Sequence, residues 1–305
     1  MLKTIVKTVK YLVFVLTGLM LILATLYYYR LSQRPAQSPL KKTLWQGISY
    51  QRIVKKTPRN IMIHLVSIDL SAKGIHFLVS PPGNPETFDI NAQRTSHFLQ
   101  KYKLQVAING SFFRPFHSHG PFDYYPHEGD PVDVLGLAIS SAKTYSDDFN
   151  DWAVFCANKT RVSISQTGCP EQTRQAIAGK QMIVKQGKRN TKNLTGSYAT
   201  SAQPRSAIAL NKEQNKVWFV VVDGRQKNYS EGINLNELAN LLLDIGAYNA
   251  INLDGGGSST LVTQQASGKA LLLNAPFHTK IPMHERPVAN HLGVYALPAD
   301  SALDM

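Results

Sequence analysis

Residues 250–262 read Ala250-Ile251-Asn252-Leu253-Asp254-Gly255-Gly256-Gly257-Ser258-Ser259-Thr260-Leu261-Val262: an apolar run, a carboxylate, three glycines and three hydroxyl side chains. Successive glycines cost backbone entropy, so a chain keeps them where positive φ or very close backbone approach is needed. A strand that ends at Asp254 and opens into glycines places a carboxylate beside free N–H groups, which suits an anion. The alternative interpretation is a tight turn capped by an Asp and a Ser.

The chain before this stretch predicts a β-α-β unit. Val217–Val222 and Ala250–Leu253 are apolar strands, and residues 235–245 carry leucines at helical spacing. Asn234, with a Glu three positions later, approximates a capping box, and Gly246 suits the end of the helix. If both strands join one sheet, they are parallel and end at the same edge.

Polar residues follow these strand ends. Asp223 follows the first strand and Asp254 the second. A helix over 91–102 and a strand over 104–108 predict a similar unit that brings Asn109 to the same edge. Open sheets bind ligands beyond the carboxyl ends of parallel strands. We therefore expect the three side chains to converge, whereas a different sheet order would separate them.

Three arginines accompany these residues. Arg205 precedes a strand, Arg225 lies two positions after Asp223, and Arg286 precedes the final strand. A guanidinium suits a phosphate because its fork matches two oxygens. For Arg205 and Arg225 the alternative is a solvated surface side chain, and for Arg286 it is a structural ion pair with Glu285.

The rest of the chain favours short strands. Residues 47–54 and 61–70 predict an antiparallel pair, and His64 is interpreted as an ordinary strand residue. Residues 114–134 form a long Pro- and His-containing loop, which in a compact domain is usually functional or mobile. The predicted fold class is α+β: a mixed, largely antiparallel sheet with a few packed helices, preceded by one N-terminal transmembrane helix.

The N-terminus carries much of the formal net charge of +13. Residues 1–42 contain seven Lys and Arg residues and no Asp or Glu. Tyr11–Tyr29 is uncharged and long enough to span a bilayer, and its three terminal tyrosines suit an interface. A cleaved signal peptide is the alternative, but no small-x-small site closes the apolar run. An uncleaved anchor with the domain exported to a periplasmic or extracellular space is the favoured topology.

These observations divide the chain into four parts: a basic flank (1–10), an anchor or uncleaved signal (11–29), a linker (30–43) and a globular domain (44–300), which the family resemblance given below implies to be the catalytic domain. The remaining positive charge suits an anionic substrate or surface, and no motif indicates nucleic acid. In an exported domain, Cys156 and Cys169 could close a small disulfide loop; two free thiols are the alternative.

Six segments occur in the order seen in phosphodiester glycosidases, which the sequence resembles over about residues 60–297: Asn109–Phe113, Pro204–Ala207, Asp223–Arg225, Asn234–Gly246, Leu253–Thr260 and Arg286–Asn290. The chain departs from many relatives at Ser111 and in the long 114–134 loop. The resemblance implies a hydrolase that cleaves the sugar C1–O bond of a glycosyl phosphodiester, of N-acetylglucosaminyl type, and bacterial relatives are associated with exopolysaccharides.

The resemblance also implies roles for particular residues. Asp254 is the first candidate for the catalytic carboxylate and Asp223 the second. Arg205 and the amides of the three glycines would hold the phosphate, Asn109 would orient a sugar hydroxyl, and Arg286 would bind phosphate or brace the site. The complete predicted substrate-binding set is Asn109, Arg205, Arg225, Gly255, Gly256, Gly257, Ser258, Ser259 and Arg286.

Two other functions stay open. No metal or cofactor is predicted, but a divalent cation is possible, and a metal-dependent phosphodiesterase could use Asp223, Asp254 and residues of the long loop (His117, His119, Asp123, His127, Glu128, Asp130 and Asp133). The spacing of these residues matches no known motif, which favours the alternative of a solvated loop. The second is a non-catalytic protein that binds or assembles envelope polysaccharide. A nucleotide-binding loop is disfavoured because the Lys-Ser/Thr of a P-loop is missing.

Overall fold

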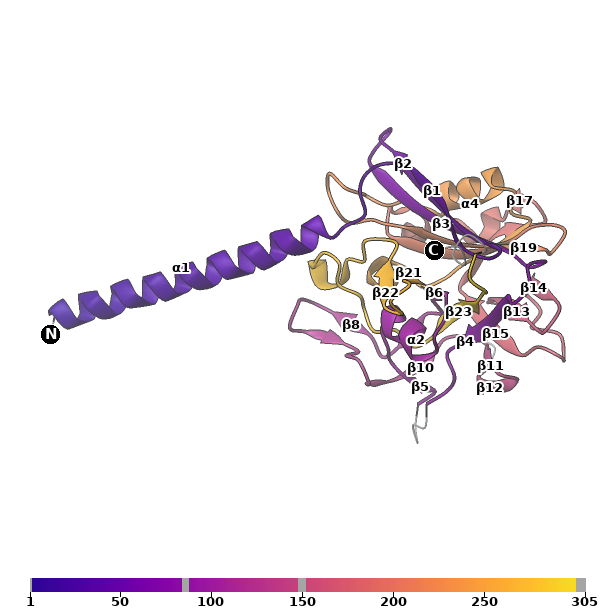
Figure 1. Ribbon diagram of the computed structural model, residues 1–305, viewed down its shortest axis with the longest axis horizontal. Helices are drawn as coiled ribbons and strands as arrows, with labels where there is room; N and C mark the ends of the chain where they lie inside the picture. The colour runs from indigo at the N-terminus through magenta and orange to yellow at the C-terminus, as the bar shows by residue number, and fades with distance from the viewer. Residues whose placement is uncertain (1, 84–87, 148–151, 300–305) are drawn as a thin grey trace.

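A long helix projects from a β-rich body in the computed structural model, which describes residues 2–83, 88–147 and 152–299 (Figure 1). Helix α1 (Leu2–Ser32) has 31 residues and contains the apolar segment identified in the sequence. It is long and apolar enough to cross a membrane, and its side chains are not buried against the body. The body has mostly antiparallel sheets with few helices, so the predicted fold class is confirmed.

The largest sheet has eight strands, and every neighbouring pair is antiparallel. Its order is β1 (Leu40–Trp45), β2 (Ile48–Lys55), β3 (Ile61–Asp69), β19 (Lys216–Val222), β18 (Arg205–Leu210), β20 (Asn249–Asn252), β16 (Gln181–Lys185) and β17 (Lys188–Arg189). Strand β1 begins inside the segment expected to be a linker, because residues 40–45 pair with β2.

The predicted β-α-β unit is present with one change. Strand β18 lies between β19 and β20 and is antiparallel to both, so the two strands run parallel without being neighbours. Helix α4 (Leu235–Asp244) connects them and begins with a complete capping box at Asn234. Because the strands share a direction, Asp223 and Asp254 both follow strand ends at one edge of the sheet.

Alternate residues of β19 face the two sides of the sheet, as the period of two in a strand requires. Val217, Phe219 and Val221 enter the main core, whereas Val220 and Val222 pack with α4. This central strand is therefore buried on both faces, which explains its unbroken apolar sequence. The α4 side also contains α3 (Ser197–Thr200) and the 3-10 turn η1 (Thr191–Asn193).

Strand β6 (Val106–Asn109) belongs to a second sheet, so the prediction that it ends at the same sheet edge as β19 and β20 was wrong. This sheet has the order β22 (Ala270–Leu272), β21 (Leu261–Gln264), β6, β23 (His291–Tyr295) and β4 (His76–Val79). Helix α2 (Thr95–Lys101) packs on it through Phe98 and Leu99. Residues 254–260, the glycine loop, carry the chain from β20 in the first sheet to β21 in the second, which brings Asn109 back to Asp254.

A third sheet contains β12 (Lys143–Ser146), β11 (Ala138–Ser140), β15 (Gln175–Gly179), β13 (Ala153–Ala157) and β14 (Val162–Ser165). The three sheets share one core, to which Ile108, Phe155, Phe219 and Leu292 contribute. The segment expected to be a long loop contains short strands: β7 (Phe113–Arg114), β8 (His117–Ser118), β9 (Tyr124–Tyr125) and β10 (Pro131–Val134), the last paired with β5 (Ile90–Asn91) and β7.

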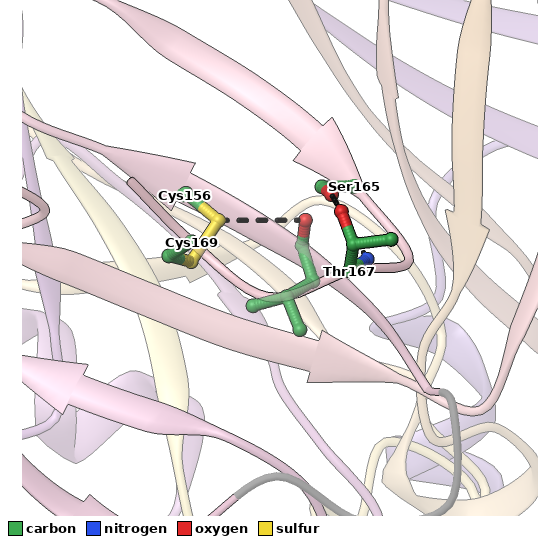
Figure 2. Close-up of a disulfide and its surroundings, with 5 residues drawn as sticks. Cys156, Ser165, Thr167 and Cys169 are labelled. Atoms are coloured by element: carbon green, nitrogen blue, oxygen red, sulfur yellow. Dashed lines mark hydrogen bonds between the residues drawn. A yellow bond between two sulfur atoms is a disulfide. The ribbon is translucent and has the colours of Figure 1, made fainter. Parts of the chain in front are cut away.

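A disulfide joins Cys156, in β13, to Cys169, in the segment that follows β14, with 5.7 Å between the two Cα atoms (Figure 2). Their sequence separation is 13 residues. Closing a loop of this length restricts the unfolded chain by about 3 kcal/mol. The Cys156→Ser/Cys169→Ser double variant should therefore lose about 2–3 kcal/mol of unfolding free energy, measured by urea denaturation.

The wild type with reductant should lose a similar amount, whereas reductant should not affect the double variant. An unchanged urea midpoint in both experiments would show that the disulfide does not stabilise the fold.

Candidate active site

The backbone of Asp254 is held on both sides. Its N–H donates to the carbonyl of Gly110 at 3.0 Å, and its carbonyl accepts from the Asn109 Nδ2 at 2.7 Å. The Asn109 Oδ1 also accepts from the Ser206 hydroxyl at 2.7 Å and from the Thr260 N–H at 3.1 Å. Asn109 is fully buried, so its amide fixes both ends of the glycine loop. The structure thus gives it a positioning contact in place of the solvent-facing position expected for a sugar ligand.

The Asp254 carboxylate is hydrogen-bonded by its own loop. Its Oδ1 accepts from the Gly255 N–H at 2.9 Å, and its Oδ2 accepts from the Ser258 hydroxyl at 2.5 Å. Burial raises the pKa of Asp254, and the Arg286 charge, these two hydrogen bonds and the Arg225 charge offset the rise in part. The result is a carboxylate with a pKa above its ordinary range, held beside two cations.

Arg286 is the more deeply placed cation. Its Nη1 donates to the Ser258 Oγ at 3.0 Å, and its Nε donates to the His278 Nδ1 at 3.2 Å. Its guanidinium carbon lies 4.4 Å from the centre of the Phe116 ring. Burial lowers the pKa of Arg286 to about 10. Burial, followed by the Arg286 charge, lowers the pKa of His278 to about 3, so this imidazole is neutral and can accept the hydrogen bond.

Arg225 lies on the other side of the loop and is exposed. Its Nε donates to the Gln203 Oε1 at 2.6 Å. A Cβ atom at Gly256 would lie 3.0 Å from the Arg225 Nη2, and one at Gly257 would lie 2.6 Å from the Arg286 Nη2. Gly257 thus leaves room for the buried Arg286 guanidinium, whereas Gly256 has a φ of +61°, a backbone conformation that favours glycine.

The expected amide cradle is only partly available. The Gly255 N–H donates to Asp254, and the Gly256 N–H donates to the carbonyl of Pro204 at 2.9 Å. Positive charge beside the loop comes from the two arginine side chains. The hydroxyls of Ser258 and Ser259 differ: Ser258 connects Asp254 to Arg286, whereas the buried Ser259 Oγ has no hydrogen-bond partner among the described residues.

Arg205 has a structural environment. It is 1% exposed, and its guanidinium donates to the backbone carbonyls of Ile233, Tyr198 and Ser201. These bonds hold α3 against the sheet, and the Arg205 guanidinium also lies 4.6 Å from the centre of the Tyr198 ring. The structure therefore does not turn Arg205 toward solvent, where the sequence had placed a phosphate ligand.

Tyr198 and Lys180 lie beside the site but were not identified from the sequence. The Tyr198 ring is 36% exposed, and its pKa, raised mainly by burial, also responds to the Asp254 charge. The Lys180 Nζ lies 5.4 Å from the centre of that ring and 5.8 Å from the centre of the Phe112 ring. Neither residue belongs to a motif. The sequence shows only a basic residue at 180 and an aromatic residue at 198, both in short polar segments, and this does not distinguish them from surface residues.

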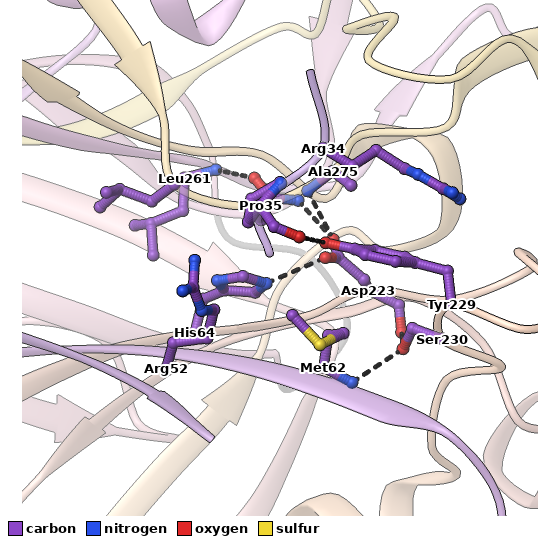
Figure 3. Close-up of polar contacts among 12 residues, drawn as sticks. Arg34, Pro35, Arg52, Met62, His64, Asp223, Tyr229, Ser230, Leu261 and Ala275 are labelled. Carbon is purple, nitrogen blue, oxygen red and sulfur yellow. Dashed lines mark hydrogen bonds and ion pairs between the residues drawn. The ribbon is translucent and has the colours of Figure 1, made fainter. Parts of the chain in front are cut away.

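Asp223 lies in a separate buried network, shown in Figure 3. Its Oδ2 pairs with the His64 Nε2 at 2.9 Å, and its Oδ1 accepts from the Asn274 Nδ2 and the Ala275 N–H, each at 2.9 Å. Asn274 also donates to the carbonyl of Ser259 at 3.0 Å, which connects Asp223 to the glycine loop. Asp223 is 1% exposed, so its carboxylate acts from the interior of the protein and supports the glycine loop through Asn274. The fully buried His64, expected to be an ordinary strand residue, is part of this network.

The structure also bears on two alternatives from the sequence: an ion pair between Glu285 and Arg286, and a metal site formed with the long loop. Glu285 accepts from the N–H of Ser96 at 2.9 Å, at the start of α2, and Arg286 bonds to Ser258 and His278 instead of to Glu285. Within the ranges that the structure describes, the group of three side chains that could hold a metal ion is His117, His119 and Asp123, on the β8–β9 hairpin. It contains neither Asp223 nor Asp254.

The fold and this carboxylate–arginine site define a protein suited to an anionic substrate. The sequence model of the phosphodiester glycosidase family matches residues 102–295. That match includes Asp254, both arginines of the site and more than half of the chain, so the protein belongs to the phosphodiester glycosidase family. No curated protein matches the sequence significantly.

Solved structures share the fold. The catalytic domain of zebrafish N-acetylglucosamine-1-phosphodiester alpha-N-acetylglucosaminidase, auto-inhibited by its pro-peptide, is 23% identical with a TM-score of 0.59, over 86% of this chain and 85% of that chain. A hypothetical protein from Synechocystis is 16% identical with a TM-score of 0.53, over 86% of this chain and 64% of that one. A Burkholderia pseudomallei protein is 12% identical with a TM-score of 0.58, over 87% and 98%.

Proposed function

We propose that this protein hydrolyses the sugar C1–O bond of a glycosyl phosphodiester, of N-acetylglucosaminyl type, on an envelope or extracellular glycan. The observation that carries the proposal is the Asp254 carboxylate, joined through Ser258 to Arg286 and with Arg225 facing the same glycine loop. Family membership supports a hydrolase that acts on phosphodiester glycosides. The particular sugar, the bond cleaved and the residue roles are parts of the proposal.

In the proposed reaction the two arginines bind the phosphate. The leaving group is a phosphate monoester, which is weakly basic and departs without the strong acid that an ordinary glycoside needs. Arg225 and Arg286 stabilise the charge that develops on it. Asp254 lies beside them and stabilises the oxocarbenium-like sugar, as nucleophile, base or counter-charge. The oxygen of water ends on C1, and its two protons are shared between the new sugar hydroxyl and the released phosphate or solvent.

The proposed sugar subsite is next to α3. The half-exposed ring of Tyr198 gives an apolar face, and Lys180 lies near it with Phe112. Asp223 and Asn109 act in this scheme as positioning residues, because both are buried and hydrogen-bonded to backbone groups of the glycine loop or its neighbours. Arg205 positions α3 and so the Tyr198 ring.

The proposed topology has α1 as an uncleaved anchor with its N-terminus inside and the domain exported. The apolar length of α1 and the three lysines at its N-terminal end (Lys3, Lys7 and Lys10) support this orientation. The Cys156–Cys169 disulfide supports an oxidising compartment for the domain, since cytosolic thiols are generally kept reduced.

The test uses the full chain in detergent with an N-acetylglucosaminyl phosphodiester in ¹⁸O-water, with and without a chelator. We expect turnover that places ¹⁸O on the sugar C1 hydroxyl and survives chelation. Label on phosphate, lost with the chelator, would overturn the proposal in favour of a metal-dependent phosphodiesterase. Saturable glycan binding without turnover of this diester or related ones would overturn it in favour of a polysaccharide-binding protein.

Gly257→Ala tests the close approach of Arg286 to the loop. The added Cβ would lie 2.6 Å from the Arg286 Nη2, so the guanidinium or the loop must shift, which disturbs the hydrogen bond between Arg286 and Ser258. We expect kcat/KM to fall about 10- to 100-fold, because the charge on the leaving phosphate is then less well stabilised. The matched control is Gly120→Ala, where an added Cβ meets nothing within 4 Å and the rate should be unchanged. Equal rates in the two variants would contradict this role of Gly257.

A further inference from the structure

The chain that leaves α1 packs directly against the loop that follows the site residue Arg225. The Arg34 guanidinium lies 4.4 Å from the centre of the Tyr229 ring, and the Tyr229 hydroxyl donates to the Pro35 carbonyl at 3.0 Å (Figure 3). Gln37 donates to the backbone carbonyls of Asn228 and Tyr229, each at 3.1 Å. Residues 226–230 are thus attached to the start of the linker by contacts of several kinds.

These contacts limit how far the site can lie from the end of α1. The helix ends at Ser32, and two residues of extended chain reach about 7 Å to Arg34. Arg225 immediately precedes the attached loop, and Ser230 within it donates to the Asp223 carbonyl at 2.6 Å. If α1 spans a bilayer, with Arg30 at the interface, this side of the site lies close to the lipid headgroups.

The part of the site around Arg286 also lies toward the end of α1. The His278 ring, which accepts from Arg286, lies 5.2 Å from that of His284. Burial and, among the charges, Arg30 at the end of α1 lower the pKa of His284. Figure 1 shows the yellow segment that contains the 3-10 turn η3 (His278–Lys280) near the end of the anchor.

The β8–β9 hairpin adds an apolar tip on this side. Figure 1 shows the hairpin extending toward the side from which α1 projects. Phe116, at its base, lies over Arg286, and Tyr124 packs edge-on against His278 with ring centres 4.8 Å apart. Phe122, at its tip, is 100% exposed. Phe122 thus lies, in sequence, between Phe116 and Tyr124, which both contact the site. Contact of the hairpin tip with a lipid interface, where aromatic rings are favoured, would explain its full exposure.

Basic residues surround these elements. Arg30 and Arg34 lie at the end of the anchor, Lys227 is exposed in the attached loop, and Lys280 is exposed in η3. Basic residues near an anionic membrane surface are attracted to it. The same face that carries the site thus combines positive charge with an exposed aromatic tip.

We propose that the active site lies at the bilayer surface and acts on a lipid-linked glycosyl phosphodiester, with Phe122 inserted among the lipid headgroups. This inference rests on the proposed function and on α1 as an anchor. A substrate attached to lipid is held at the depth of Arg225, Asp254 and Arg286, and confinement to one surface raises its effective concentration. A soluble polymer or short diester gains nothing from this position.

The geometric test measures membrane contact without turnover. Because both cysteines of the chain are in the disulfide, Phe122→Cys gives one labelling site. The full chain is reconstituted in vesicles containing anionic lipid, and an environment-sensitive fluorophore at position 122 is exposed to a lipid-bound quencher. Lys188→Cys, on the exposed strand β17 away from α1 in Figure 1, is the matched control. We expect quenching at 122 and none at 188; equal quenching would overturn the proposed placement.

The catalytic test compares one sugar phosphodiester on a membrane lipid with the same group on a short soluble alcohol. A flexible Gly/Ser spacer of about 20 residues between Ser32 and Gln33 lets the domain move away from the surface. We expect the rate on the lipid substrate to fall about tenfold and the rate on the soluble substrate to stay the same. Equal loss on both, or none on either, would overturn the lipid-linked substrate. Absence of turnover on both in the wild type would refute the proposed function, while the quenching result would still decide the placement.

Discussion

Replacing Asp254 by Asn should abolish turnover and leave the fold intact. The amide oxygen of the variant can still accept from the Gly255 N–H, and its nitrogen can donate to the Ser258 oxygen, so the loop keeps one hydrogen bond and reverses the other. It removes the negative charge that would face the sugar in the proposed reaction and that Ser258 connects to the Arg286 cation. Loss of a group that acts only in the transition state should lower kcat by about 10³-fold or more, measured by release of the sugar under saturating substrate.

The matched control is Asp244→Asn, at the exposed end of α4, which should keep full activity. Urea unfolding of both variants should give midpoints close to that of the wild type. An active Asp254→Asn protein would remove Asp254 from the mechanism.

The pH profile provides a second test of the same carboxylate. In the proposed reaction Asp254 acts in its ionised form, and burial raises its pKa, so kcat/KM should fall with decreasing pH at a value above the ordinary aspartate pKa of about 3.9. At high pH the activity should fall again as Arg286, with a pKa of about 10, loses its proton. An acid limb at or below the ordinary aspartate value would contradict this assignment.

Replacing Asp223 by Ala should strongly destabilise the buried network that supports the glycine loop. It leaves the His64 Nε2 and the Ala275 N–H without a partner in a buried region and removes one of the two acceptors of Asn274. Removing one partner from a buried charged network typically costs about 3–5 kcal/mol. We expect a loss of this size in the free energy of unfolding, measured by urea denaturation.

Asp223→Asn is the informative partner variant. Its Oδ1 still accepts from Asn274 and Ala275, and the other tautomer of His64 can accept from the new amide while donating to the Tyr50 hydroxyl, which lies 2.8 Å from Nδ1. The loss of stability should therefore be smaller, about 1–2 kcal/mol. As a positioning residue, Asp223 should tolerate this change with kcat within about tenfold of the wild type. Loss of turnover as complete as in Asp254→Asn, with the fold retained, would instead make Asp223 the second catalytic carboxylate.

Much of the fold could be predicted from the sequence because the signals are local. The apolar run of β19, the capping box at Asn234 and the glycine after α4 each act within a few residues. They identified α4 and the two parallel strands around it, and the uncharged N-terminal run identified α1. The strand β18 between β19 and β20 could not be inferred, because strand order depends on pairing between distant segments.

The sequence by itself thus determined the fold class, the family resemblance and the two acidic strand ends at one edge. Only the tertiary structure decided which polar side chains face the site and which lie beneath it. Asn109 and Asp254 are 145 residues apart, and Asp223 and His64 are 159 apart, yet each pair is hydrogen-bonded. A buried polar group requires a partner, and that partner comes from whichever segment packs against it. For this reason the side chains of Arg205 and Asn109 bind backbone groups inside the protein. The side chains of Arg225 and Arg286 instead lie beside the Asp254 carboxylate.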